Sequence, residues 1–143
     1  MKLLKQLLIL FSFGLFVYAC GSSPIKKNTT TEEKPVIIAN DSLEYEVIII
    51  DPGFNAFLAS VAKPEGYYSQ NYLEARNRTW VLEWNNRARN PIQFNANIYE
   101  NIVDYQSTTD YGYDVNYKLF NYFLFAQQKY KMNLGGGFSS RIR

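Results

Sequence analysis

One segment near the carboxyl end of this 143-residue chain, residues 114–131, constrains the fold more than any other. Its apolar side chains recur at helical spacing and form one stripe, which consists of Val115, Leu119, Tyr122, Phe123, Ala126 and Tyr130. Phe120 and Leu124 widen that stripe over most of the helix girth. A helix of this kind is stable in water only where other elements cover it. The sequence therefore predicts a helix that is capped by Asp114, ends near Lys131 and lies at the centre of a small domain.

Two further helices are predicted before this central one. The first spans Phe54–Val61, where apolar residues repeat at helical spacing. The second follows a cap at either Ser69 or Asn71 and ends at about Arg89, because Asn90-Pro91 stops a helix. Its apolar stripe consists of Leu73, Trp80, Val81, Trp84 and Ala88. Both tryptophans share this stripe with aliphatic residues, so we expect them in the core rather than on an exposed platform.

Period-two patterns predict three strands. Val36–Ala39 and Leu43–Ile50 flank turn residues and are expected to form a hairpin, and Ile98–Tyr105 alternates as a third strand. The continuous apolar run Val47–Ile50 predicts that both strand faces are covered there. A lone pair of strands is marginally stable in water. We therefore expect either a three-stranded sheet packed on helices or a sheet that a partner completes.

Together these elements predict one small α+β domain over residues 36–132, with about three short strands, two main helices and one short helix. The expected order is β-β-α-α-β-α. Residues 20–35 are polar and lack periodicity, which predicts a flexible tether with a root-mean-square span of roughly 20 Å. Residues 133–143 contain a run of three glycines, 135–137, and two arginines at their end, which predicts a flexible basic tail.

Residues 1–19 have the organisation of a secretory signal, with two lysines before a short apolar run. That run is shorter than the about 20 apolar residues that span a bilayer. Val17-Tyr18-Ala19-Cys20 resembles the lipobox of bacterial lipoproteins. The resemblance implies that the signal is cleaved and that Cys20 is acylated and holds the chain on a membrane. Gly21 stands where inner-membrane lipoproteins typically have Asp, which implies the outer membrane of a Gram-negative envelope.

The composition excludes several classes of chemistry. The chain has no histidine, which excludes Ser-His-Asp and Cys-His catalysis and imidazole metal sites. Its single cysteine, Cys20, excludes an intrachain disulfide and multi-cysteine metal sites. Without the two lysines of the signal, basic and acidic residues are equal in number, so no nucleic-acid surface is expected. Asp104, Asp110 and Asp114 do not have EF-hand spacing, so we expect turn and capping roles and no metal or cofactor.

Several separated motifs stand out together in the chain. They are Asn40–Glu46, Ile50–Phe54, Gly66–Ser69, Glu83–Asn85, Asp110–Asp114 and the Asn116-Tyr117 pair. In this order they resemble a family of short bacterial envelope lipoproteins of unknown function. The resemblance spans about Asn40 to Tyr130. It implies an envelope lipoprotein and provides no catalytic residues to transfer.

Loop tyrosines are the best binding candidates in the sequence. Tyr67 and Tyr68 follow a glycine, and Tyr111 and Tyr113 flank one, so we expect these four rings at the surface. Tyrosine is also enriched at protein interfaces. Asp51 ends a predicted strand before Pro52-Gly53, where ordinary turn chemistry is favoured over a site. Asp110 begins the tyrosine loop and is the second acidic candidate.

Three functions fit these residues. The favoured one is a non-catalytic binding or assembly module for an envelope protein, with the tyrosine loops as the contact. The second is glycan or peptidoglycan binding through exposed aromatic rings. The third is a carboxylate-dependent hydrolase, in which the fold pairs Asp51 with Glu83 or Asp110.

Overall fold

The computed structural model describes residues 34–135. The expected signal, the lipid-attachment residue Cys20, nearly all of the tether and most of the tail lie outside these residues. The described elements are, in order, β1 (Val36–Asn40), the 3-10 turn η2 (Asp41–Leu43), β2 (Tyr45–Ile49), α2 (Phe54–Ser60), α3 (Gln70–Ala88) and α4 (Gly112–Lys129). The predicted α+β class is confirmed, with one two-stranded antiparallel sheet and the order β-β-α-α-α. Within the described range no helix has the length and apolar character needed to cross a membrane.

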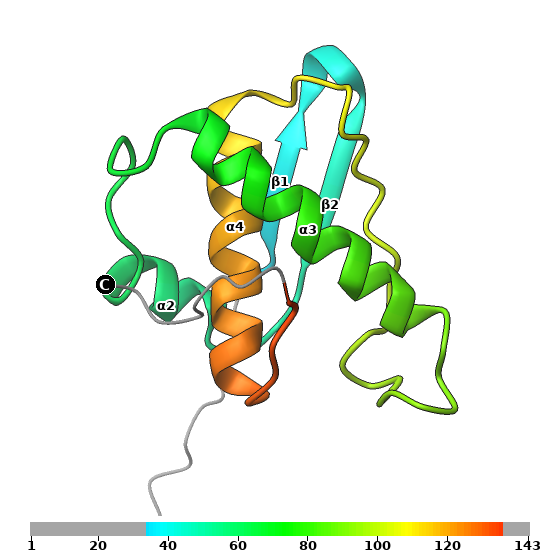
Figure 1. The fold of residues 1–143 in the computed structure, drawn as a ribbon. Coiled ribbons are helices and arrows are strands. Elements are labelled where there is room, and N and C mark those ends of the chain that lie inside the picture. Colours follow the sequence, from blue (N-terminus) through cyan, green and yellow to red (C-terminus); the bar gives the residue numbers. More distant parts are fainter. Residues whose placement is uncertain (1–33, 136–143) are drawn as a thin grey trace, which may run out of the picture. The chain divides into compact units, whose positions relative to one another are not determined.

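Helix α4 is the central element, as its sequence predicts. In Figure 1 it stands between the hairpin and α2, and α3 crosses it. Leu119 and Phe123 on α4 are fully buried, and so is Leu73 on α3. The two tryptophans of α3 fill the core between these helices, because Trp80 stacks on Phe120 at 5.4 Å and both rings are buried. The expectation of core tryptophans is confirmed for Trp84 as well, which is 3% exposed.

The two long helices begin in different ways. Ser69 caps α3, because its hydroxyl accepts a hydrogen bond from the Tyr72 amide at 3.3 Å. The prediction that Asp114 caps α4 is wrong. That helix has Tyr111 at its N-cap position without a side-chain cap bond, and the Asp110 carboxylate instead accepts the Gly112 amide at 2.9 Å. Asp114 pairs with Lys118 one turn further on, at 2.7 Å.

The helices cover only one of the two faces of the hairpin. Ile37 and Ile48 lie directly opposite each other across the strand pair and are 50% and 52% exposed. Ile38 and Ile49, on the other face, are buried against the helices. The prediction that the apolar end of β2 is covered on both sides is therefore wrong. Ile50, just past the strand, is 74% exposed.

The predicted third strand, Ile98–Tyr105, does not form. Its alternation is real, since Tyr99 and Val103 are buried. However, side chains of α3 bond to the backbone of this segment. Asn85 donates to the Val103 carbonyl and accepts from the Val103 amide, both at 2.8 Å, and the Trp84 indole donates to the Asn101 carbonyl at 2.9 Å. The two Asn85 bonds are the pair that a neighbouring strand would otherwise make.

Candidate binding groove

A groove of about 340 Å³ lies along β2, and we call it the β2 groove. One wall is formed by residues 47–52 and the other by residues of the 97–103 segment. Trp84, Tyr122 and Tyr130 also line it. In Figure 1 the segment from residue 100 onward (yellow-green to yellow) runs next to β2, which agrees with its place in the opposite wall.

The β2 groove follows an open strand edge. Successive side chains of a strand point to opposite faces. Four consecutive residues, 47–50, line the groove, so this wall is formed by the edge of the strand and its continuation rather than by one face. Among residues 34–135, β2 pairs only with β1. The other edge of β2 therefore has no strand beside it in the described chain.

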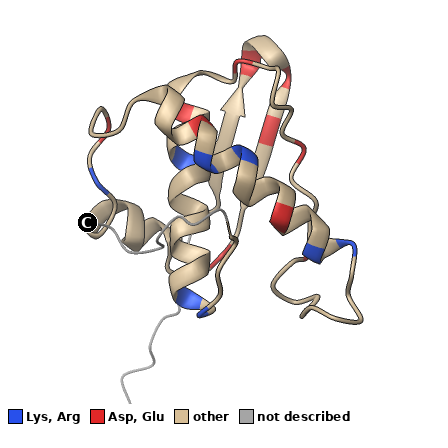
Figure 2. Ribbon diagram, in the orientation of Figure 1, with Lys and Arg blue, Asp and Glu red and all other residues tan. Residues whose placement is uncertain are grey.

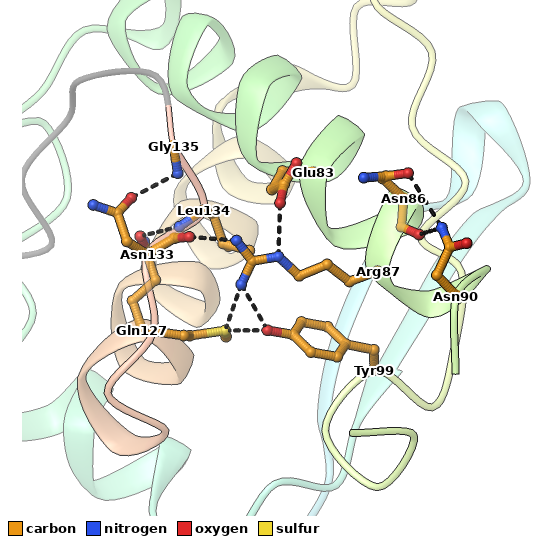
Figure 3. Close-up of polar contacts among 10 residues, drawn as sticks. Glu83, Asn86, Arg87, Asn90, Tyr99, Gln127, Asn133, Leu134 and Gly135 are labelled. Carbon is orange, nitrogen blue, oxygen red and sulfur yellow. Dashed lines mark hydrogen bonds and ion pairs between the residues drawn. The ribbon is translucent and has the colours of Figure 1, made fainter. Parts of the chain in front are cut away.

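The wall opposite β2 is held in place by Arg87 of α3. Its guanidinium donates to Glu83 at 2.7 Å, to the Tyr99 hydroxyl at 2.9 Å and to the Asn133 carbonyl at 2.6 Å. Figure 3 shows Arg87 joining α3 to these two other segments. Burial alone lowers the pKa of Arg87, but the hydrogen bonds to Tyr99 and Glu83 outweigh it, so the pKa lies above its ordinary value. Arg87 is therefore charged and links α3 to Tyr99 in the groove wall and to Asn133 near the end of the described chain.

The chain after α4 is fixed in the same region. The Gln127 side chain accepts the Leu134 amide at 2.9 Å, and Leu134 is fully buried. The Tyr99 hydroxyl lies 2.8 Å from the Met132 sulfur. The Tyr99 contact ties the 97–103 wall of the β2 groove to the chain after α4.

Asp51 lies in the β2 groove and is already paired. Lys129 donates to its carboxylate and to the Pro52 carbonyl, and the Tyr130 hydroxyl donates to the carboxylate oxygens at 3.0 and 3.1 Å. This arrangement fixes the end of β2 on the last turn of α4. Burial, together with the charge of Asp51, raises the pKa of the Tyr122 phenol, which keeps this groove residue neutral.

The two acidic candidates of the sequence are not brought together. Asp51 is bonded at the end of α4, whereas Asp110 is bonded at its start, where it also accepts from the Gln70 side chain at 2.7 Å. The 18 residues of α4 separate these ends by about 26 Å. Glycosidase carboxylate pairs lie within about 9.5 Å of each other. Asp51 and Asp110 therefore cannot act on one bond, and residues 34–135 contain no acidic cluster suited to a metal ion.

The tyrosine candidates separate into surface and core. Tyr67 is 56% exposed and contacts Tyr68 edge-on at 4.7 Å. Tyr68 in turn stacks on Tyr72 at 4.7 Å, and the Arg76 guanidinium lies over the Tyr72 ring at 4.0 Å. We call Tyr67, Tyr68 and Tyr72 the aromatic ladder. Lys63 lies over its outer ring, 5.2 Å from the centre of Tyr67.

The other two tyrosines have internal contacts. The Tyr113 hydroxyl accepts the Gly66 amide at 2.6 Å and donates to the Tyr68 carbonyl at 3.2 Å, which fastens the 66–68 loop to α4. Tyr111 is only 5% exposed, so the expectation of a surface position is wrong for this ring. It stacks on Tyr105 at 4.8 Å, and its hydroxyl accepts the Gln106 amide at 2.8 Å.

The sequence pattern of a family described as "Family of unknown function (DUF6146)" matches residues 7–141. The chain belongs to this family. No curated protein and no solved structure matches the chain. The matched region of DUF6146 includes the apolar run before Cys20 as well as every described element. This match agrees with the resemblance found in the sequence on one point, which is that the family has no known function.

Sequence reasoning missed the β2 groove of this DUF6146 member. The pattern of residues 98–105 predicts a strand there, and the alternative of a sheet that a partner completes does not place a groove. The signal that pointed elsewhere is the row of exposed carboxylates on this side of the molecule, since residues 35–62 and 90–117 contain no lysine or arginine. A charge pattern of this kind marks a surface rather than a buried sheet.

Proposed function

We propose that the chain is a lipid-anchored envelope protein without catalytic activity that binds a protein partner through the outer face of its hairpin. The observation that carries this proposal is the exposure of Ile37, Ile48 and Ile50. The first two are direct cross-strand partners, and the third follows at the spacing of one strand face. Single exposed apolar residues are common on protein surfaces, whereas a contiguous group is typical of an interaction site.

The anchor in this proposal is a lipid on Cys20. It is supported by the lipobox resemblance of Val17-Tyr18-Ala19-Cys20. A diacylated or triacylated cysteine holds a protein on a membrane almost permanently, because each buried CH₂ contributes about 0.8 kcal/mol. The resemblance favours the outer membrane. The tether then keeps the domain close to that membrane, so its partner is another envelope protein.

The partner-binding face is tested by site-specific photo-crosslinking in cells that produce the full chain. A benzoylphenylalanine at position 48 should give a discrete protein adduct, because Ile48 is at the centre of the proposed contact. Position 82 is the matched control, since Leu82 is on α3 and is 72% exposed. Equal adducts at both positions, or none at position 48, would contradict binding through the hairpin.

The anchor is tested by metabolic labelling with an alkyne fatty acid. Cys20→Ala should abolish lipid labelling and release the chain from the membrane fraction, because the chain has one cysteine. Ser22→Ala is the control and should keep the label. Unchanged labelling of Cys20→Ala would contradict the lipoprotein assignment.

The aromatic ladder favours one alternative, which is glycan binding. Its exposed ring, Tyr67, leads to the stacked pair of Tyr68 and Tyr72, and such rings stack on sugar faces. Soluble peptidoglycan fragments should then change the tyrosine fluorescence of the wild type and not that of Tyr67→Ala. No response to any fragment would remove this alternative. We do not propose a hydrolase that pairs Asp51 with Asp110, because these residues are held at opposite ends of α4. The pairing of Asp51 with Glu83 stays a prediction.

A further inference from the structure

We propose that the β2 groove accepts an extended, positively charged segment of the partner protein as a third strand beside β2. This inference rests on the proposed function, because it assumes that the partner is a protein. It adds the mode of binding, the chemistry of the bound segment and its place on the domain.

The first reason is the open edge of β2. A strand edge presents backbone amides and carbonyls that another extended chain can pair with. Segment 97–103, on the far side of the groove, does not pair as a strand with β2, and its Val103 backbone bonds are already made to Asn85. The groove therefore leaves space beside the edge. Three of its wall residues, 47–49, belong to β2 and Ile50 follows them, so this wall offers about 13 Å of chain, enough for about four partner residues.

The second reason is stability. A two-stranded sheet is marginal in water unless it packs on other elements or gains a strand. Here the inner face of the hairpin packs on the helices, but Ile37 and Ile48 remain half exposed on the outer face. A third strand would extend that face and cover part of Ile48 and Ile50. Partner side chains of the opposite parity would point into the groove toward Trp84 and Tyr122.

The third reason is charge. The hairpin carries Asp41, Glu44 and Glu46, and the segment across the groove carries Glu100, which lines the groove, and Asp104; all five are exposed. Figure 2 shows these acidic segments on the hairpin and on the neighbouring loop, while basic segments occur on α3 and at the end of α4. Of the two acids that line the groove, Asp51 is paired with Lys129. The remaining charge favours a segment in which lysine or arginine alternates with apolar residues.

The same charge disfavours a second copy as the occupant. Pairing β2 of one chain with β2 of another would bring the acidic hairpins side by side, and like charges across a strand pair are destabilising. We therefore expect a basic partner segment and no hairpin-mediated dimer.

The proposal is tested with detergent-solubilised full chain and the peptide acetyl-Lys-Val-Lys-Val-Lys-Val-amide. The basic peptide should bind the chain at least about tenfold more tightly than an analogue with Glu in place of each Lys, because only the basic peptide complements the charge of the hairpin. Binding should shift the amide NMR signals of residues 47–50. Equal affinity for the two peptides, shifts confined to other residues, or formation of a chain dimer instead would each overturn the proposal.

Backbone pairing has its own control, which distinguishes a strand from simple charge attraction. Two peptides of the same sequence carry N-methyl groups on alternate residues, so that each one blocks a different edge. One methylated peptide should bind about tenfold or more weakly than the unmethylated peptide, and the other should bind nearly as tightly as the unmethylated peptide. The reason is that only one edge of the peptide faces β2. Equal binding of both methylated peptides would overturn strand addition.

The acidic contribution is tested by Glu46→Gln with Glu100→Gln. This double variant should bind the basic peptide several-fold more weakly, whereas Glu65→Gln, at another exposed loop, should bind it as the wild type does. Unchanged binding by the double variant would overturn the charge argument. If the peptide fails and the adduct at position 48 persists, strand addition is wrong and protein binding stands. Loss of both results would contradict both proposals.

Discussion

At the residue scale, Asn85 explains why a strand-like sequence does not form a strand. Its side-chain amide, on α3, makes the hydrogen bonds to both the backbone amide and the backbone carbonyl of Val103. Alternation in a sequence reports which side chains are buried, and it does not report what the backbone bonds to. In residues 98–105 the face that carries Tyr99 and Val103 is the buried one, and the alternation alone identifies neither that face nor the group that bonds to the backbone.

Replacing Asn85 tests this role directly. Asn85→Leu keeps the side-chain size but leaves the buried Val103 amide and carbonyl without their partner, so we expect a loss of about 3 kcal/mol in the free energy of unfolding. Urea denaturation measures it. Asn86→Leu is the control, since Asn86 is exposed one residue later on α3 and its change should cost less than about 0.5 kcal/mol. Equal stability of the two variants would contradict the assignment.

At the element scale, the helices are the part that the sequence predicts well. Their apolar periodicity and stop signals depend on residues near in sequence, and α2, α3 and α4 all form close to their expected ranges. The candidate site is predicted poorly because it depends on distant contacts. Tyr111 is buried by Tyr105, and Asp51 is paired with Lys129 from the far end of the chain. Neither contact leaves a local pattern.

The start of α3 provides a test at this scale, because two residues compete as its cap in the sequence. Ser69→Ala removes the hydroxyl that accepts the Tyr72 amide and should lower the free energy of unfolding by about 1 kcal/mol. Asn71→Ala should have a much smaller effect, since Asn71 is exposed inside the helix. Thermal unfolding of both variants measures the difference. A larger loss in Asn71→Ala would show that the cap is misassigned.

At the scale of the whole molecule, the buried tyrosines make the folded state less stable as the pH becomes alkaline. Burial is the largest cause that raises the pKa of Tyr45, Tyr105 and Tyr122, and it raises that of Tyr105 to about 12. In the unfolded chain these phenols ionise near pH 10. Between these values the unfolded state binds fewer protons than the folded state, so the stability is full below about pH 10 and is lost as the pH rises toward about 12.

This alkaline loss is measured by urea denaturation at several pH values, with tyrosinate absorbance as the second readout. Tyr105→Phe should flatten the decline above about pH 10, because one buried ionisable phenol is removed. Tyr67→Phe, which changes an exposed ring, should leave the decline as in the wild type. A decline that is equally steep in Tyr105→Phe and the wild type would contradict a role for that phenol.

The acidic surface of the hairpin also has a consequence for how the protein is handled. An uncovered strand edge invites copies of a chain to stack on one another. The carboxylates around β2 oppose that stacking by mutual repulsion, which dissolved ions screen within about 10 Å at 0.1 M. The protein should therefore remain dispersed in dilute buffer and form precipitates as salt is added, the opposite of the salting-in that many soluble domains show.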